Sequence, residues 1–302
     1  MSEKNYNLYK TYIDLKVKKL YNIKDYDLCW EGVVRMKKIL AFFTVLVIVV
    51  FAFAENFAGI FSAVPFPSDK KKPDREIFSL FSAFTAADVE KTIREEEKKR
   101  KESIPEDTKK KLIEETLKKL KNGKISLRKV FSSTCFVGDS LLNGLEVYNI
   151  LSADKLITEV SARLDHLEDN IKKITKTNPE VLVLHYGLNM LWEDETGTQW
   201  FIDDYSTLIK KIKKALPYTR IIVSGIFPVD TEIVTDEIFS HIPRHNTALK
   251  KMCKDIGVEF LDSTALVEEC AEYYGPDGIH FVADFYSEKW LPYIVENKGI
   301  TG

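Results

Sequence analysis

The second half of the chain alternates short apolar runs with longer amphipathic stretches, and this alternation limits the folds that the chain can adopt. From Ser126 onward, five apolar or β-branched runs have the length of buried strands, at residues 135–137, 156–160, 181–184, 221–224 and 258–261. Runs that are apolar on both faces and separated by helices predict a parallel sheet covered on both sides.

The amphipathic stretches between these runs predict the covering helices. They occupy residues 164–174, 205–216, 241–256 and 284–295. The expected fold class is therefore α/β, a three-layer α/β/α sandwich around a mainly parallel five-stranded sheet. In such sheets ligands bind beyond the carboxyl ends of the strands. The residues directly after each strand are thus the candidates for a functional site.

Composition argues against two kinds of partner. The 302-residue chain is 45% hydrophobic, which suffices for a substantial core, and its formal net charge is only -2 although 30% of its residues are charged. A nucleic-acid-binding surface normally leaves a basic excess, so nucleic acid is not expected as the main partner. The cysteines, Cys29, Cys135, Cys253 and Cys270, form no CxxC pair, which argues against a structural metal. Their spacing leaves a disulfide between Cys253 and Cys270 open.

The N-terminal part contains an apolar run that begins after Met36 and two lysines. The run is uninterrupted over residues 39–54 apart from Thr44, and it continues less purely to Val64. One interpretation is a signal peptide that starts at Met36, with residues 1–35 as a translated leader. The other, which we favour because the apolar character persists, is a transmembrane signal anchor over residues 36–64, with residues 1–35 in the cytoplasm. Both interpretations place the rest of the chain outside the cytoplasm, either on the cell membrane as a single-pass protein or secreted.

Residues 65–125 predict a spacer. Prolines open this segment, and Glu and Lys dominate residues 88–124. Asp88 and Pro105 have the character of helix starts, and Gly123 that of a helix stop. We therefore expect a charged, largely helical spacer, followed by a catalytic domain over residues 126–302.

Three polar blocks lie in loops that the predicted sheet places at one edge, two of them directly after strands. They are Gly138-Asp139-Ser140-Leu141 after the first strand, Gly187-Leu188-Asn189 after the third, and Asp277-Gly278-Ile279-His280 near the C-terminus. A serine at a strand-to-helix turn has its backbone N–H among the unpaired donors of the helix start, where negative charge is favoured. In their order, these blocks resemble the motifs of the SGNH, or GDSL, hydrolase family of esterases and acylhydrolases. The resemblance covers about residues 130–298 and implies a flavodoxin-like sheet.

The resemblance also implies roles for individual residues. Ser140 would be the nucleophile, His280 the general base, and Asp277 the carboxylate that orients the imidazole. The backbone N–H of Ser140 and the side chain of Asn189 would bind the oxyanion. The family's usual glycine after the second strand, which supplies a further donor, is absent here. A backbone N–H survives any such substitution, so Ser161 is the candidate donor, with Ala162 beside it as the alternative.

Other residues at the strand ends are expected to contact the substrate, namely Asp139, Gly187, His185 and Trp192. Trp192 and Trp200 lie in a predicted loop, where they can stack on a sugar or acyl group or pack within the loop. The remaining histidines, His166, His241 and His245, have spacings that make no metal set and are interpreted as structural or surface residues. No cofactor is expected, because Ser-His-Asp chemistry needs none.

Together these features predict an extracytoplasmic serine esterase that cleaves an O-acyl ester, foremost O-acetyl, on a cell-wall or exopolysaccharide glycan. The expected partners are an acylated glycan or lipid ester and, through the N-terminal helix, the membrane. A lipase or lysophospholipase and a sugar O-acyltransferase with the same triad are alternatives. A non-catalytic carbohydrate-binding or scaffolding protein on the same fold is an alternative of another class.

Overall fold

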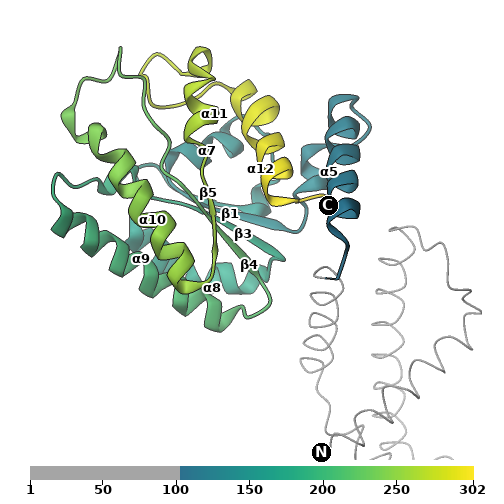
Figure 1. The fold of residues 1–302 in the computed structure, drawn as a ribbon, viewed down its shortest axis with the longest axis horizontal. Helices are drawn as coiled ribbons and strands as arrows, with labels where there is room; N and C mark the ends of the chain where they lie inside the picture. The colour runs from purple at the N-terminus through teal and green to yellow at the C-terminus, as the bar shows by residue number, and fades with distance from the viewer. Residues whose placement is uncertain (1–102) are drawn as a thin grey trace, which may run out of the picture. The chain divides into compact units, whose positions relative to one another are not determined.

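The computed structural model describes residues 103–302 (Figure 1). The predicted leader, the membrane segment and the first part of the spacer lie outside the described residues. Within residues 103–302, no helix has the length and apolar character needed to cross a membrane.

Five parallel strands form the central sheet, as the alternation of apolar runs predicted. They are β1 (Thr134–Gly138), β2 (Leu156–Thr158), β3 (Val181–His185), β4 (Arg220–Ser224) and β5 (Glu259–Leu261), in the order β2-β1-β3-β4-β5. The chain moves from β1 outward to β2 and then returns to the other side of β1 with β3. This reversal creates a switch point at the carboxyl ends of β1 and β3, where ligands bind in open α/β sheets.

Helices cover both faces of the sheet and give the predicted three layers (Figure 1). One face packs against α8 (Leu164–Thr177), α9 (Glu195–Ala215) and α10 (Ile242–Ile256). The other packs against α7 (Ser140–Val147), α11 (Thr264–Glu268) and α12 (Leu291–Lys298). Strand β1 contributes side chains to the hydrophobic cores on both faces of the sheet. Cys135 and Val137 point to the first face, and Phe136 points to the second. The short elements are α6 (Leu127–Val130), η2 (Ala153–Lys155), η3 (Leu188–Met190), η4 (Glu237–His241) and η5 (Ala271–Tyr273).

Two helices differ from their predicted limits. Helix α9 begins at Glu195, ten residues before the amphipathic stretch, because the Asp194 side chain accepts the Gly197 N–H and caps the helix. Trp200 therefore lies on a helix and not in a loop. The C-terminal helix begins as a π-helical turn, η6 (Phe285–Trp290), before α12.

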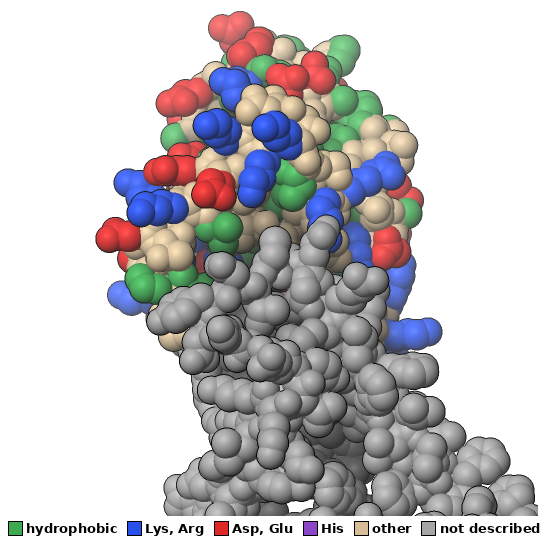
Figure 2. Space-filling model, turned by 90° about the vertical axis from the view of Figure 1, so that its right-hand side faces the viewer, with side chains coloured by type: hydrophobic (Ala, Val, Ile, Leu, Met, Phe, Trp, Pro, Cys, Tyr) green, Lys and Arg blue, Asp and Glu red, His purple; other side chains and the backbone are tan. Residues whose placement is uncertain are grey.

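The last part of the predicted spacer packs onto the folded unit. Helix α5 (Glu106–Lys121) follows Pro105 and ends before Gly123, and it lies against α12 (Figure 1). Ile113, Leu117 and Leu120 pack against the core on the α12 side of the sheet. Figure 2 shows the corresponding side of the molecule, where Lys and Arg side chains alternate with Asp and Glu.

The cysteines of the described residues carry no cross-link. Cys135, Cys253 and Cys270 are free and buried. The disulfide that the spacing left open between Cys253 and Cys270 is therefore not formed.

Candidate active site

Ser140 stands at the turn between β1 and α7. The side chain of Asp139 accepts the Leu141 N–H at 3.1 Å and caps α7, so that Ser140 becomes the first helical residue. Gly138 is required directly before this turn, because a Cβ there would lie 2.4 Å from the His185 carbonyl oxygen on β3. The hydroxyl is thus held at the amino end of a helix, at the switch point of the sheet.

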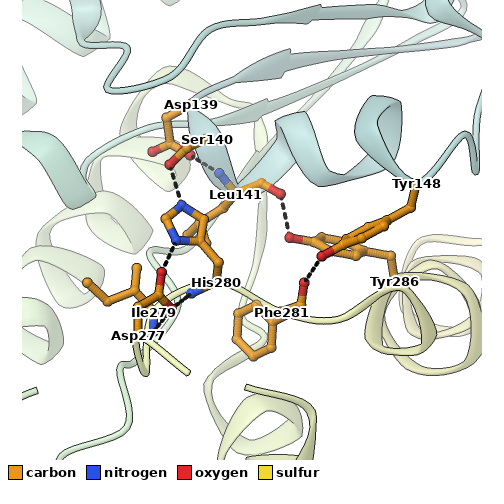
Figure 3. A network of polar contacts seen from close by, with 9 residues as sticks. All are labelled: Asp139, Ser140, Leu141, Tyr148, Asp277, Ile279, His280, Phe281 and Tyr286. Atoms are coloured by element: carbon orange, nitrogen blue, oxygen red, sulfur yellow. Dashed lines mark hydrogen bonds and ion pairs between the residues drawn. The ribbon is translucent and has the colours of Figure 1, made fainter. Parts of the chain in front are cut away.

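His280 and Asp277 meet Ser140 in one chain of hydrogen bonds (Figure 3). The Nε2 atom of His280 lies 2.9 Å from the Ser140 Oγ, and its Nδ1 lies 2.7 Å from the Asp277 Oδ2. The side chains of His280 and Asp277 are 45% and 52% exposed. The structure therefore brings together the three residues that the sequence separates by up to 140 positions, and the site is open to solvent.

Asp277 is held as a carboxylate by its own loop. Burial acts to raise its pKa, but the backbone N–H groups of His280 and Ile279 and the ring of His280 outweigh it and lower the pKa to about 2. Gly278 permits this tight loop, since its φ is +68° and an added Cβ would lie 2.9 Å from the Cβ of Ile233. An ionised Asp277 can fix the tautomer of His280 and stabilise the imidazolium.

Two tyrosines tie α7 to the segment that follows His280 (Figure 3). Tyr286 donates to the Leu141 carbonyl at 2.7 Å, and Tyr148 donates to the Phe281 carbonyl at 3.1 Å. Gly144 makes room for the ring of Tyr286, because a Cβ at this position would lie 2.7 Å from that ring. Sequence reasoning missed these supports, although a glycine within a helix was the available signal.

Asn189 and the segment after β2 come together at the same sheet edge. Asn189 lies in η3 and donates from Nδ2 to the Ala162 carbonyl at 3.2 Å. Ser161 has a φ of +58°, a conformation that glycine adopts most easily. The Ala162 N–H is used by the Glu159 carbonyl, whereas the Ser161 N–H donates to no acceptor within residues 103–302. Of the two backbone donors that the sequence left open, Ser161 is the free one.

Asp139 and His185, for which the sequence predicts substrate contact, are both buried. Asp139 is 0% exposed, and burial raises its pKa to about 7. Its Oδ1 caps α7, while its Oδ2 has no hydrogen-bond partner within the described residues. His185 is 1% exposed and packs against Phe227 and Trp290, and burial lowers its pKa to about 3. Asp139 supports the turn that carries Ser140, and His185 is a neutral core residue.

The other two predicted contact residues differ in exposure. Gly187 is buried with a φ of +137°, and an added Cβ would lie 2.5 Å from the Ile226 side chain. Trp192 is 38% exposed, and its ring meets that of Trp200 edge-on at 5.9 Å. His245 accepts the Trp192 N–H at 3.2 Å, which gives this histidine the structural role that was predicted. Trp192 therefore remains available to a ligand, whereas Gly187 serves packing.

Within residues 103–302, no group of three or more His, Cys, Asp or Glu side chains is arranged to hold a metal ion. The hydrogen-bonded hydroxyl, imidazole and carboxylate instead form the arrangement of a nucleophile, a base and an orienting group.

Comparison with solved structures finds several similar chains. A protein described as a GDSL-like lipase from Parabacteroides merdae is 16% identical, with a TM-score of 0.45 over 55% of this chain and 94% of that one. An acetyl xylan esterase from Geobacillus stearothermophilus is 14% identical, with a TM-score of 0.40 over 53% and 93% of the two chains. Another acetyl xylan esterase is 17% identical, with a TM-score of 0.38 over 51% and 96%. No curated protein matches the sequence.

The model of the GDSL-like lipase/acylhydrolase family matches residues 136–287. This segment is half of the chain, and it contains Ser140, Asn189, Asp277 and His280. The chain therefore belongs to the GDSL-like lipase/acylhydrolase family and is a hydrolase of ester bonds.

Proposed function

We propose that the protein is a serine esterase that removes a short acyl group, foremost O-acetyl, from a glycan outside the cytoplasm. The hydrogen-bonded series Ser140, His280 and Asp277 carries this proposal. The extracytoplasmic location rests on the apolar run at residues 39–64, which lies outside the described residues.

In the acylation step, Ser140 Oγ attacks the ester carbonyl carbon while His280 Nε2 takes the hydroxyl proton. Asp277 accepts the Nδ1–H of His280 and stabilises the positive charge that forms on the ring. The carbonyl oxygen becomes an oxyanion, which binds the N–H groups of Ser140 and Ser161 and the amide of Asn189. His280 then returns the proton to the sugar oxygen, and the alcohol leaves.

In the deacylation step, water replaces the sugar alcohol. His280 takes a proton from the water, the hydroxide oxygen attacks the acyl carbon, and the proton passes to Ser140 Oγ as the acid is released. A sugar hydroxyl in place of water would give acyl transfer with the same residues. The half-exposed side chains of His280 and Asp277 support a bulky, solvated ester as substrate.

A substrate panel with the full chain tests the proposal. Esters of p-nitrophenol with acetyl, butyryl and decanoyl groups, and an O-acetylated oligosaccharide, should show a preference for acetyl. Ser140→Ala should abolish turnover and labelling by a serine-directed phosphonate. Ser132→Ala, at an exposed serine near the start of β1, is the matched control and should leave both unchanged.

Each outcome of the panel has a defined meaning. A preference for decanoyl over acetyl esters would replace the glycan esterase with a lipase. Turnover that survives Ser140→Ala would remove Ser140 as the nucleophile. A wild-type chain without turnover or labelling would favour a binding protein on the same fold.

A further inference from the structure

Two cavities adjoin each other beside the candidate oxyanion site. The larger, of about 430 Å³, lies between α8 and α9, and the smaller, of about 210 Å³, lies between the segment after β2 and α8. Arg163 and Asp165 line both cavities, so the two cavities meet at these residues and are taken together as one site. We call it the α8–α9 groove. The larger cavity alone has the volume of an ordinary small-molecule site.

The groove begins at Ser161, one of the residues that would bind the oxyanion. Ser161 and Ala162 line its smaller cavity, and Met190, the neighbour of Asn189, lines its larger one. Asn189 donates to the Ala162 carbonyl, and the Leu164 N–H contacts the Met190 sulfur at 3.4 Å, so the two walls are joined at this end. From there the groove extends along α9 to Asp204 and Lys211. A substrate whose ester carbonyl sits at Ser161 can therefore continue into the groove.

Charged side chains line most of the smaller cavity, and in the larger one they alternate with Leu164, Met190 and Leu208. Its carboxylates are Glu159, Asp165, Glu168, Asp169 and Asp204, and its basic side chains are Arg163 and Lys211. Moving an acyl chain against such groups would cost free energy, since they would lose water without gaining hydrogen bonds. Sugar hydroxyls both donate to carboxylates and accept from Arg and Lys, and hydrogen bonds to charged groups are the stronger ones.

An ion pair also bridges the two helices that line the groove. Lys211 on α9 and Glu168 on α8 form an ion pair of 2.7 Å that links the two helices. The excess of carboxylates would repel a glycan that carries uronate or phosphate groups. Neutral sugars and sugars with free amino groups fit this charge balance.

We propose that the α8–α9 groove binds the sugar units next to the esterified one and selects neutral or amino-bearing glycans over acidic ones. This inference rests on the proposed function. It adds to the proposed esterase a glycan subsite and a preference for substrate charge, and neither is required for ester hydrolysis itself.

Filling the groove tests the subsite. Thr207 is exposed and lines the larger cavity, so Thr207→Trp should block that cavity. Lys210→Trp is the matched control, because Lys210 is an exposed residue of α9 that does not line the cavity. With an O-acetylated neutral oligosaccharide, Thr207→Trp should raise KM at least about tenfold with little change in kcat, as expected when uniform binding is lost. With p-nitrophenyl acetate, both variants should match the wild-type chain.

Charge reversal tests the preference. The wild-type chain should favour an O-acetylated neutral oligosaccharide over an O-acetylated oligogalacturonate, and Asp204→Lys combined with Asp169→Lys should reduce or invert that ratio. A wild-type preference for the oligogalacturonate, or a ratio unchanged by the substitutions, would overturn the selectivity.

The test separates the two proposals. If Ser140-dependent hydrolysis of p-nitrophenyl acetate is present but Thr207→Trp changes no oligosaccharide KM, the subsite is wrong and the esterase stands. If Ser140→Ala retains hydrolysis, the proposed function fails. Calorimetric titration of the oligosaccharide into Ser140→Ala, with and without Thr207→Trp, gives a second readout: binding unchanged by the tryptophan would also overturn the subsite.

Discussion

The carboxylate of Asp277 holds His280 at two points. Its Oδ1 accepts the backbone N–H of His280 at 2.9 Å, and its Oδ2 lies 2.7 Å from the ring Nδ1. One side chain therefore fixes both the loop and the imidazole. Only the second contact requires a negative charge for the reaction, so the two functions can be separated by substitution.

Asp277→Asn should keep the loop and lose the chemistry. The amide oxygen can still accept the backbone N–H groups, but the ring loses its anionic partner and its required tautomer. We expect kcat on p-nitrophenyl acetate to fall by roughly 10⁴, the loss seen for this substitution in serine proteases, with little change in thermal unfolding. Asp284→Asn, at an exposed residue just after the His280 segment, should have no effect. A loss below tenfold would contradict the orienting role.

Asn189→Ala should lower the turnover number with a much smaller effect on KM. Its amide already reaches the Ala162 carbonyl, and a second N–H remains for an oxyanion. Removing one oxyanion donor typically costs 10²–10³ in kcat, or roughly 2.7–4 kcal/mol. Steady-state kinetics on the acetyl ester measures this, and an unchanged kcat would exclude Asn189 from the oxyanion site.

Ser161 offers a test of a donor that belongs to the backbone. Ser161→Gly should leave kcat unchanged and relieve the strain of a φ of +58°, which is worth on the order of 1 kcal/mol. Ser161→Ala should also keep its activity, because the N–H remains. Ser161→Pro lacks the N–H and cannot adopt a positive φ, so kcat should fall by about 10² or more. Equal activity of all three variants in the acetyl-ester assay would assign the donor elsewhere.

Asp139 should make stability depend on pH in the direction opposite to a typical carboxylate. Burial raises its pKa to about 7, so between about pH 4 and pH 7 the folded chain binds a proton that the unfolded chain does not. The free energy of unfolding should therefore fall as the pH rises through this window. Asp139→Asn keeps the cap on Leu141 and removes the titration.

Urea unfolding at several pH values measures this effect. The variant should gain stability relative to the wild-type chain from pH 4 to pH 8, by up to about 4 kcal/mol. Asp236→Asn changes the exposed carboxylate that caps η4 in the same way, through the Ile238 N–H, and should show no such trend. A stability difference between Asp139→Asn and wild type that is constant with pH would contradict the buried titration.

Sequence reasoning predicted the strands and the residues that the structure brings together at the candidate site, because both leave local signals. The runs that became β1 and β3 are apolar at every position, and Ser140, Asn189 and His280 each follow a turn with glycine. The burial of Asp139 and His185 could not be predicted in the same way, since burial depends on neighbours from strands and helices that are distant in the sequence. The cavity between α8 and α9 could not be predicted from the sequence either, because it exists only once the two helices are packed side by side.

The start of α9 and the role of α5 were missed for a related reason. Gly197 and Thr198 are poor helix formers, and the helix begins before them because Asp194 caps it and the Trp192 ring packs on Gly197. In α5, Lys and Glu dominate the composition and obscure the apolar stripe of Ile113, Leu117 and Leu120. A charged helix with such a stripe can be a solvated spacer or a helix that packs on a domain. Here it packs, because α12 provides a surface for the stripe.

Because one face of α5 packs onto the folded unit, substitutions on its two faces should differ in their effect on stability. Leu117 is partly buried against the core beside α12, whereas Leu112 on the same helix is 42% exposed. Leu117→Ala should lower the free energy of unfolding by about 1–3 kcal/mol, less than the 2–5 kcal/mol of a fully buried leucine, and Leu112→Ala by less than about 0.5 kcal/mol. Urea unfolding followed by circular dichroism compares them, and hydrolysis of p-nitrophenyl acetate should stay at the wild-type rate in both. Equal stability of the two variants would mean that α5 contributes no packing energy and behaves as the spacer that its composition predicted.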